Sequence, residues 1–281
     1  MLDFINLLKR SGKIWTGILI PLVLGTIVFV PLYLLVDGAH KQQSSRIIRE
    51  SLLTIGISDD RYKALDERMR KGDEEAFTDF LTETQRATDA IDQMQETDRE
   101  EFFRSQSIAI GLKLIPALFI FSFLGFVVFV LSKTYFLILA LGLEKDAFEA
   151  FRLSLIRLVQ MLGVSLWVII RSFIWIPVVG VIPAVILLPR LVFSWIIFLS
   201  QKKGVIKSVS ESYEKTKGKW TVVFKNYLLL FVCIVLAVTI LETVIDSSRA
   251  LGHILMLIVW QGVASFVVVF TVTLSREVLK N

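Results

Sequence analysis

LVQMLGVSLWVIIRSFIWIPVVGVIPAVILLPRLVFSWIIFL, residues 158–199, is the stretch of sequence that decides the fold of this chain. Its only charged residues are Arg171 and Arg190. A membrane-spanning helix needs about 20 apolar residues, so a run of roughly twice that length predicts two spans joined by a short turn. Pro177 and Pro183 mark the position of that turn.

Four further apolar runs complete the pattern. They cover residues 14–36, 114–131, 227–241 and 254–274. Hydrophobic residues make up 54% of the 281 positions, and their clustering predicts an all-α polytopic membrane protein with six transmembrane helices. We expect the first run to be a retained anchor, because it is longer than the apolar core of a secretory signal and Asp37 follows it directly.

The charges are unevenly distributed and predict an orientation. Residues 37–104 contain 11 Lys and Arg against 17 Asp and Glu, although the whole chain carries a net charge of +5. The positive excess lies in four basic patches, at residues 9–13, 133–157, 202–225 and 276–280. With six spans, all four patches fall on one side of the membrane. The positive-inside rule then places both termini in the cytoplasm of a plasma (inner) membrane protein.

The acidic segment between the first two spans is expected to be an external helical hairpin. Ser58, Asp59 and Asp60 offer helix caps, and Gly72 offers a stop. Further along, apolar or small residues recur every three to four positions and therefore share one helix face. These are Phe77, Leu81, Thr84, Thr88, Ile91 and Met94. The hairpin is expected to pack on itself or to join a protein partner or a second copy of the chain.

Amphipathic helices are expected on the cytoplasmic surface, at residues 2–9, 147–158 and 205–215. The segment 202–225 has seven lysines against Glu211 and Glu214. Such segments attract anionic lipid headgroups. We therefore expect a headgroup-binding site there, and we expect no nucleic-acid partner because the segment is tethered at a membrane and lacks arginine. The expected site consists of Lys215, Lys217, Lys219 and Trp220.

The two arginines within the long apolar run are a second candidate site. Counting from the predicted turn, Arg171 and Arg190 lie about 9–15 Å from the outer side. A charge at that depth is costly and often marks an ion pair, a hydrated cavity or a ligand path. An anion or lipid-headgroup site is one interpretation. The other is that Arg171 reaches the outer headgroups while Arg190 pairs with a carbonyl or with Glu242.

Catalytic and metal-binding patterns are not found in the sequence. His40 and His253 are the only histidines and lie in different external loops, and Cys233 is the only cysteine. No Walker loop, G-x-S-x-G elbow or H-E-x-x-H motif occurs. We expect no enzyme activity, no metal site and no cofactor.

The segment PRLVFSWIIFLSQKKGVIKSVSESYEKTKGKW, residues 189–220, resembles the integral-membrane domain found ahead of some bacterial glycerophosphoryl diester phosphodiesterases and in related stand-alone membrane proteins of unknown function. That family has an intramembrane arginine, a glycine at the membrane boundary and an amphipathic helix ending S-W-x-L-T-[KR]-G-x-W. The residues that fit are Arg190, Gly204, Ser212, Thr216, Lys217, Gly218 and Trp220. Tyr213 and Lys215 replace the usual Trp and Leu. The resemblance implies a membrane scaffold and not phosphodiesterase activity, which belongs to a separate soluble domain.

These patterns predict three parts: an N-terminal amphipathic segment and first span at 1–36, the external hairpin at 37–106, and a five-span membrane domain at 107–281. The expected function is non-enzymatic engagement of anionic phospholipid or of an envelope partner. The alternative is a transporter or flippase-like protein for an anionic substrate, with the two arginines lining its path.

Overall fold

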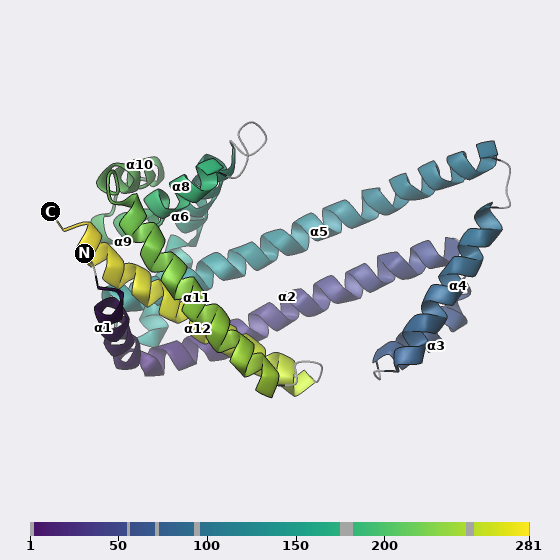
Figure 1. Cartoon of the computed structure of the whole chain (residues 1–281), viewed down its shortest axis with the longest axis horizontal. Coiled ribbons are helices and arrows are strands. Elements are labelled where there is room, and N and C mark those ends of the chain that lie inside the picture. Colours follow the sequence, from purple (N-terminus) through teal and green to yellow (C-terminus); the bar gives the residue numbers. More distant parts are fainter. Residues whose placement is uncertain are drawn as a thin grey trace. The chain divides into compact units, whose positions relative to one another are not determined.

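The regular structure is helical throughout the part of the chain that the structure describes. The computed structural model describes residues 3–54, 57–70, 73–92, 96–174, 182–245 and 250–280. Figure 1 labels the helices in chain order. Their bounds are α1 Phe4–Gly17, α2 Leu19–Thr54, α3 Asp59–Arg70, α4 Glu74–Asp92, α5 Glu96–Leu141, α6 Ala147–Phe173, α8 Ile182–Leu191, α9 Ser194–Gln201, α10 Val205–Lys215, α11 Trp220–Val244 and α12 Ala250–Val278.

Six helical stretches among the described residues are long and apolar enough to cross a membrane. The spanning stretches are Leu19–Ser51, Ile108–Leu141, Ala147–Phe173, Pro183–Gln201, Trp220–Val244 and Leu251–Val278. The predicted all-α polytopic fold is confirmed, and the fourth span is built from two helices, α8 and α9. The predicted amphipathic helix at 147–158 is the first part of α6 and not a separate element.

The chain divides into two compact units whose boundaries differ from those expected. One unit contains residues 1–33 and 126–281, and the other contains residues 34–125. No helix boundary occurs at residue 36 or 106, because α2 continues to Thr54 and α5 begins at Glu96. The apolar run predicts where the lipid-facing part of each helix lies. It does not predict where the helix ends, because polar residues of good helix propensity continue the same backbone hydrogen bonding.

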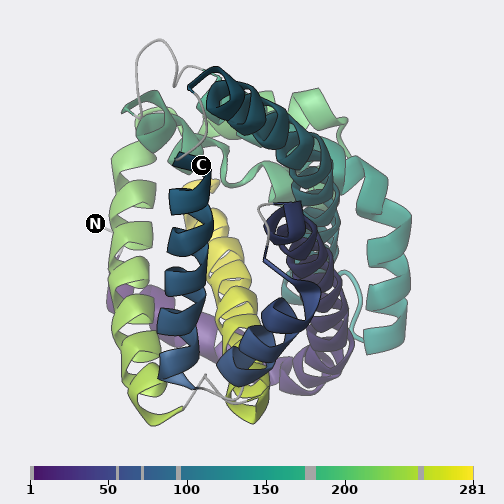
Figure 2. The same cartoon turned by 90° about the vertical axis from the view of Figure 1, so that its right-hand side faces the viewer.

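In the unit of residues 34–125, α3 and α4 form an antiparallel hairpin (Figure 2). Arg61 pairs with Glu83 at 3.3 Å, and Arg68 pairs with Asp79 at 2.7 Å. The apolar cluster is small, consisting of Ile57 and Tyr62 with Phe80 packed against them. Phe77 and Leu81 of the predicted apolar face are exposed. The side chains at 84, 88, 91 and 94 lie outside the described residues.

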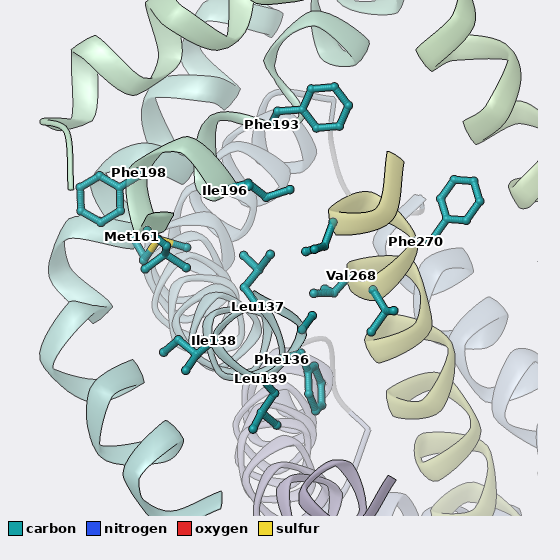
Figure 3. Packing of buried hydrophobic residues seen from close by; sticks show 14 of the residues in the cluster. Phe136, Leu137, Ile138, Leu139, Met161, Phe193, Ile196, Phe198, Val268 and Phe270 are labelled. Atoms are coloured by element: carbon teal, nitrogen blue, oxygen red, sulfur yellow. The ribbon is translucent and has the colours of Figure 1, made fainter. Parts of the chain in front are cut away.

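The core of the larger unit surrounds the end of α5. Every side chain from Tyr135 to Ala140 is at most 3% exposed, so this part of α5 is covered on all sides. Figure 3 shows Leu137 of α5, Ile196 of α9 and Val268 of α12 near one another in this core. Such all-round burial indicates that α5 is the central helix of the unit.

The two ends of the chain lie together at one end of this unit. Helix α1 packs along α12, where Trp15 Nε1 donates a 2.9 Å hydrogen bond to Ser265 Oγ and Arg10 pairs with Glu277 at 2.6 Å. The N and C marks in Figure 1 are correspondingly close. Lys219, just before α11, donates a 2.8 Å hydrogen bond to the carbonyl of Val278. We call this part, defined by Arg10, Lys219 and the end of α12, the basic end.

Candidate functional site: two arginines, a basic cleft and an intramembrane lysine

Helix α10 packs against α6, α8 and α9. Its buried face contains Ser208, Val209 and Ser212, and Thr216 follows at its end; each has 0% exposure. Ile206 on the opposite face is exposed. The alternation at helical spacing is that of an amphipathic helix, as predicted, and small residues on the buried face let it approach its neighbours closely.

The carbonyl of Arg190 is the anchor point of α10. Helix α8 ends at Leu191, so the carbonyl of Arg190 is one of the last four that lack the usual partner within the helix. Ser212 Oγ donates to it at 2.8 Å, and Thr216 Oγ1 lies 3.0 Å from it and 2.7 Å from the carbonyl of Ser212. Arg190, Ser212 and Thr216 belong to the residues that carry the family resemblance, so their spacing has a local structural explanation.

The guanidinium groups of both intramembrane arginines contact the ring of Tyr213. The Cζ atom of Arg190 lies 3.5 Å from the centre of the Tyr213 ring, and that of Arg171 lies 4.9 Å from it. The two guanidinium carbons are therefore less than about 10 Å apart. A cation over an aromatic face gains about 0.5–2 kcal/mol, depending on desolvation. Three helices, α6, α8 and α10, supply this cluster.

The arginine cluster contains an N–H donor that lacks an acceptor. Within the described part of the chain, no carboxylate pairs with Arg171 or Arg190, so neither is neutralised by Glu242. One guanidinium nitrogen of Arg190 donates to the carbonyl of Tyr213 at 3.4 Å, as in the carbonyl-pairing interpretation. Its Nε is buried without a hydrogen-bond partner among those residues. Unused donors and uncompensated positive charge together are suited to an anion.

The contacts place the arginine pair beside the end of α10. Arg190 contacts Tyr213 and Thr216, only a few residues before Trp220. These contacts were not predicted, because α10 was expected to be a surface element. In fact α10 packs lengthwise among α6, α8 and α9. The distance of the pair from the outer side stays a prediction.

The four expected headgroup-binding residues have different surroundings. Lys215 pairs with Glu211 at 2.9 Å, and Lys219 is bonded to Val278. Lys217 is exposed, and the half-buried ring of Trp220 packs 6.3 Å from that of Phe224. The structure therefore does not bring these four side chains to one point, and Lys217 is the most available of the three lysines.

Glu211 neutralises part of the basic segment. Hydrogen bonds from Lys203 and then from Lys215 hold the pKa of the Glu211 carboxyl below its usual range. The carboxylate is mostly covered, with 17% of its side chain exposed. Glu211 thereby links Lys203, in the loop before α10, to Lys215, in the last turn of the same helix.

A basic cleft lies between α1 and the end of α12. It was not predicted from the sequence. Its volume is about 300 Å³, and its charged lining consists of Arg10, Lys13, Arg276, Lys280 and one carboxylate, Glu277. Glu277 is already paired with Arg10. The available signal was the pair of basic patches at 9–13 and 276–280, which a helix packing along the last span brings side by side.

Lys133 is the residue that the sequence interpretation misplaced most clearly. It was assigned to a basic patch outside the membrane, but it lies within the spanning stretch Ile108–Leu141. Its Nζ lies 3.1 Å from the centre of the Trp195 ring. The uncharged run TYFLILALGL at 134–143 was the signal for a longer span.

Comparisons of the chain with protein-family models, with curated proteins and with solved structures give no match.

Proposed function

We propose that this chain is a non-enzymatic multi-pass membrane protein that engages anionic phospholipid at its basic end. The observation that carries the proposal is the basic cleft, where four cationic side chains converge with only Glu277 to oppose them. The cleft lies at the end of the last spanning stretch, Leu251–Val278, which is the level at which lipid headgroups occur.

The chemistry of the cleft matches a phosphate-containing headgroup. Guanidinium groups bind phosphate oxygens with paired donors, and lysine amines contribute as point charges. Near an anionic leaflet, each basic residue contributes about 1 kcal/mol of attraction. An acidic headgroup or an acidic segment of an envelope partner would satisfy the same charges, and the lipid is favoured because the cleft adjoins a spanning helix.

A lipid-binding experiment on the full chain tests the proposal. In nanodiscs with increasing phosphatidylglycerol in phosphatidylcholine, binding of a fluorescent phosphatidylglycerol is measured by energy transfer from the protein. The triple variant Lys13→Gln, Arg276→Gln, Lys280→Gln should bind about 100-fold more weakly, from about 1 kcal/mol per charge. Arg10 is retained because it pairs with Glu277.

The matched control removes equal charge from the other unit. Lys41→Gln, Lys63→Gln, Arg86→Gln changes three exposed cations of the unit of residues 34–125. This variant should bind the lipid like the unaltered protein, and salt should weaken binding in both. Equal affinity of the two triple variants would refute the proposed role of the cleft.

We place the basic end in the cytoplasm, by the positive-inside rule. Single cysteines near residues 85 and 248, in a Cys233→Ser background, should react with an impermeant thiol reagent in intact cells. Cysteines near 140, 210 and 279 should react only after permeabilisation. Reaction near residue 210 in intact cells would overturn the orientation.

A transporter or flippase-like function for an anionic substrate is the second candidate. It is favoured by the arginine cluster, in which two guanidinium groups share Tyr213 and have no carboxylate partner among the described residues. Flux of fluorescent anionic lipid in proteoliposomes distinguishes it from lipid engagement alone. Arg190→Gln should then abolish flux, whereas Arg152→Gln, an exposed position on α6, should not. No flux by the unaltered protein would exclude this candidate.

Two further expectations support a scaffold. The resemblance of residues 189–220 to the membrane domain of the phosphodiesterase family would supply such a scaffold. The exposed Phe77 and Leu81 of α4 would offer a protein partner or a second copy an apolar contact. Replacing both with serine should weaken any self-association measured by sedimentation in detergent.

A further inference from the structure

Lys133 lies deep within the larger unit. The carbonyl of Ala140 is 3.5 Å from a guanidinium nitrogen of Arg276, which marks the basic end of α5. Lys133 precedes Ala140 by about two helical turns, so it lies about 10 Å deeper. Its chain neighbours Ser132 and Thr134 are buried. An ionisable side chain at such depth is by default a functional-site hypothesis.

The amine is held by aromatic rings and has no ion-pair partner in the described ranges. Its Nζ contacts the face of Trp195 and lies 5.9 Å from the ring centre of Phe129. Trp195 is in turn fixed, because its Nε1 donates a 3.0 Å hydrogen bond to Ser165 Oγ. Cation–π contact compensates a charge only in part, and the three N–H donors of the amine need acceptors.

A cavity of about 150 Å³ adjoins the amine, between α5, the α8–α9 span, α11 and α12. Leu137, Ile196 and Val268, which line it, are the three side chains seen near one another in Figure 3. The rest of the wall consists of Val192, Val267, Trp195, Tyr227 and Thr271. The cavity therefore combines one amine with largely apolar walls.

The two hydroxyl groups of the wall leave Lys133 as the free donor. Thr271 Oγ1 donates its single proton to the carbonyl of Val267 at 2.7 Å. In that arrangement Tyr227 donates to Thr271 Oγ1, which lies 2.5 Å from its hydroxyl oxygen. With both protons used, the amine alone can donate to a ligand, and the ligand must bring acceptors.

We propose that this cavity binds a compact organic monoanion, a carboxylate on a small aromatic or branched aliphatic body, with its carboxylate on Lys133 Nζ. A single positive charge matches one negative charge, whereas a phosphate dianion would leave charge unpaired against largely apolar walls. An apolar cavity of about this size accommodates benzene, so the body of the ligand is limited to roughly that size. The site does not depend on lipid binding at the basic end.

The experiment uses the full chain in detergent and three probes of similar shape: benzoate, benzyl alcohol and benzylamine. Binding is measured by ligand-observed NMR with titration. The unaltered protein should bind benzoate saturably and at least tenfold more tightly than benzylamine. Lys133→Met should weaken benzoate at least tenfold and leave benzyl alcohol unchanged. The control Lys113→Met, at an exposed position of the same helix, should bind like the unaltered protein.

Two results would overturn the inference. One is saturable binding of benzoate that Lys133→Met does not weaken. The other is a lack of preference for benzoate over the neutral and cationic probes in the unaltered protein. The second measurement needs no variant, so the inference stays testable even if Lys133→Met does not fold.

Discussion

Gly25 of α2 is the position where one added methyl group should disturb the core most. A Cβ atom there would overlap Cε1 of Tyr135 and lie 3.1 Å from its Cδ1 and 3.2 Å from its Cζ. The Tyr135 ring is held by its own contacts, although a cavity of about 350 Å³ adjoins it. Tyr135 is 1% exposed, its hydroxyl donates a 2.6 Å hydrogen bond to the carbonyl of Pro21, and its ring packs edge-on to Phe29 at 5.6 Å.

Gly25→Ala should therefore destabilise the larger unit even though alanine favours a helix over glycine. Overpacking costs about 1–3 kcal/mol. At about 2–4 °C per kcal/mol for a chain of this size, the thermal unfolding midpoint should fall by about 2–12 °C. The midpoint is read from intrinsic tryptophan fluorescence in detergent.

Gly262→Ala is the matched control, because Gly262 lies in the spanning part of α12 and no atom lies within 4 Å of its added Cβ. Its midpoint should be unchanged or slightly higher. Combining Gly25→Ala with Tyr135→Leu should cost less than the sum of the single changes, since removing the ring removes the clash. Equal midpoints for the two alanine variants would refute the reasoning.

Two other predictions concern ion pairs outside the spans. Because the folded-state pKa of Glu211 is lowered by two lysine amines, its contribution to stability is present above the ordinary pKa of about 4.3 and is lost as pH falls through the folded value. The unfolding midpoint should therefore decrease on acidification below about pH 4, and Glu211→Gln should lack that component. In the hairpin, Arg68 bonds Asp73 and Asp79 at 2.7 Å each. Arg68→Ala should speed amide exchange in α3 and α4 several-fold, whereas Arg86→Ala, with a longer 3.4 Å contact, should leave exchange unchanged.

The six spans were predictable from the sequence because the constraint behind them is local. A backbone in hydrocarbon must satisfy its hydrogen bonds within the helix, so about 20 apolar residues in a row are sufficient evidence. The helix at residues 205–215 was also predicted, but its buried face was not, because Ser208 and Ser212 are buried whereas Ile206 is exposed. The helical hairpin of α3 and α4 was predicted from the caps at residues 58–60, and the predicted stop at Gly72 lies outside the described residues.

Which side chains meet across the spans was decided by the tertiary structure. The sequence identifies Arg171 and Arg190 as unusual, but their shared contact with Tyr213 depends on α10 packing against α6, α8 and α9. Lys133 was misassigned because a single charge near the end of an apolar run resembles a membrane boundary. Its place beside Trp195 depends on the burial of the whole end of α5. Hydrophobicity determines whether a segment enters the membrane, whereas packing between segments distant in the sequence determines which charges it encloses.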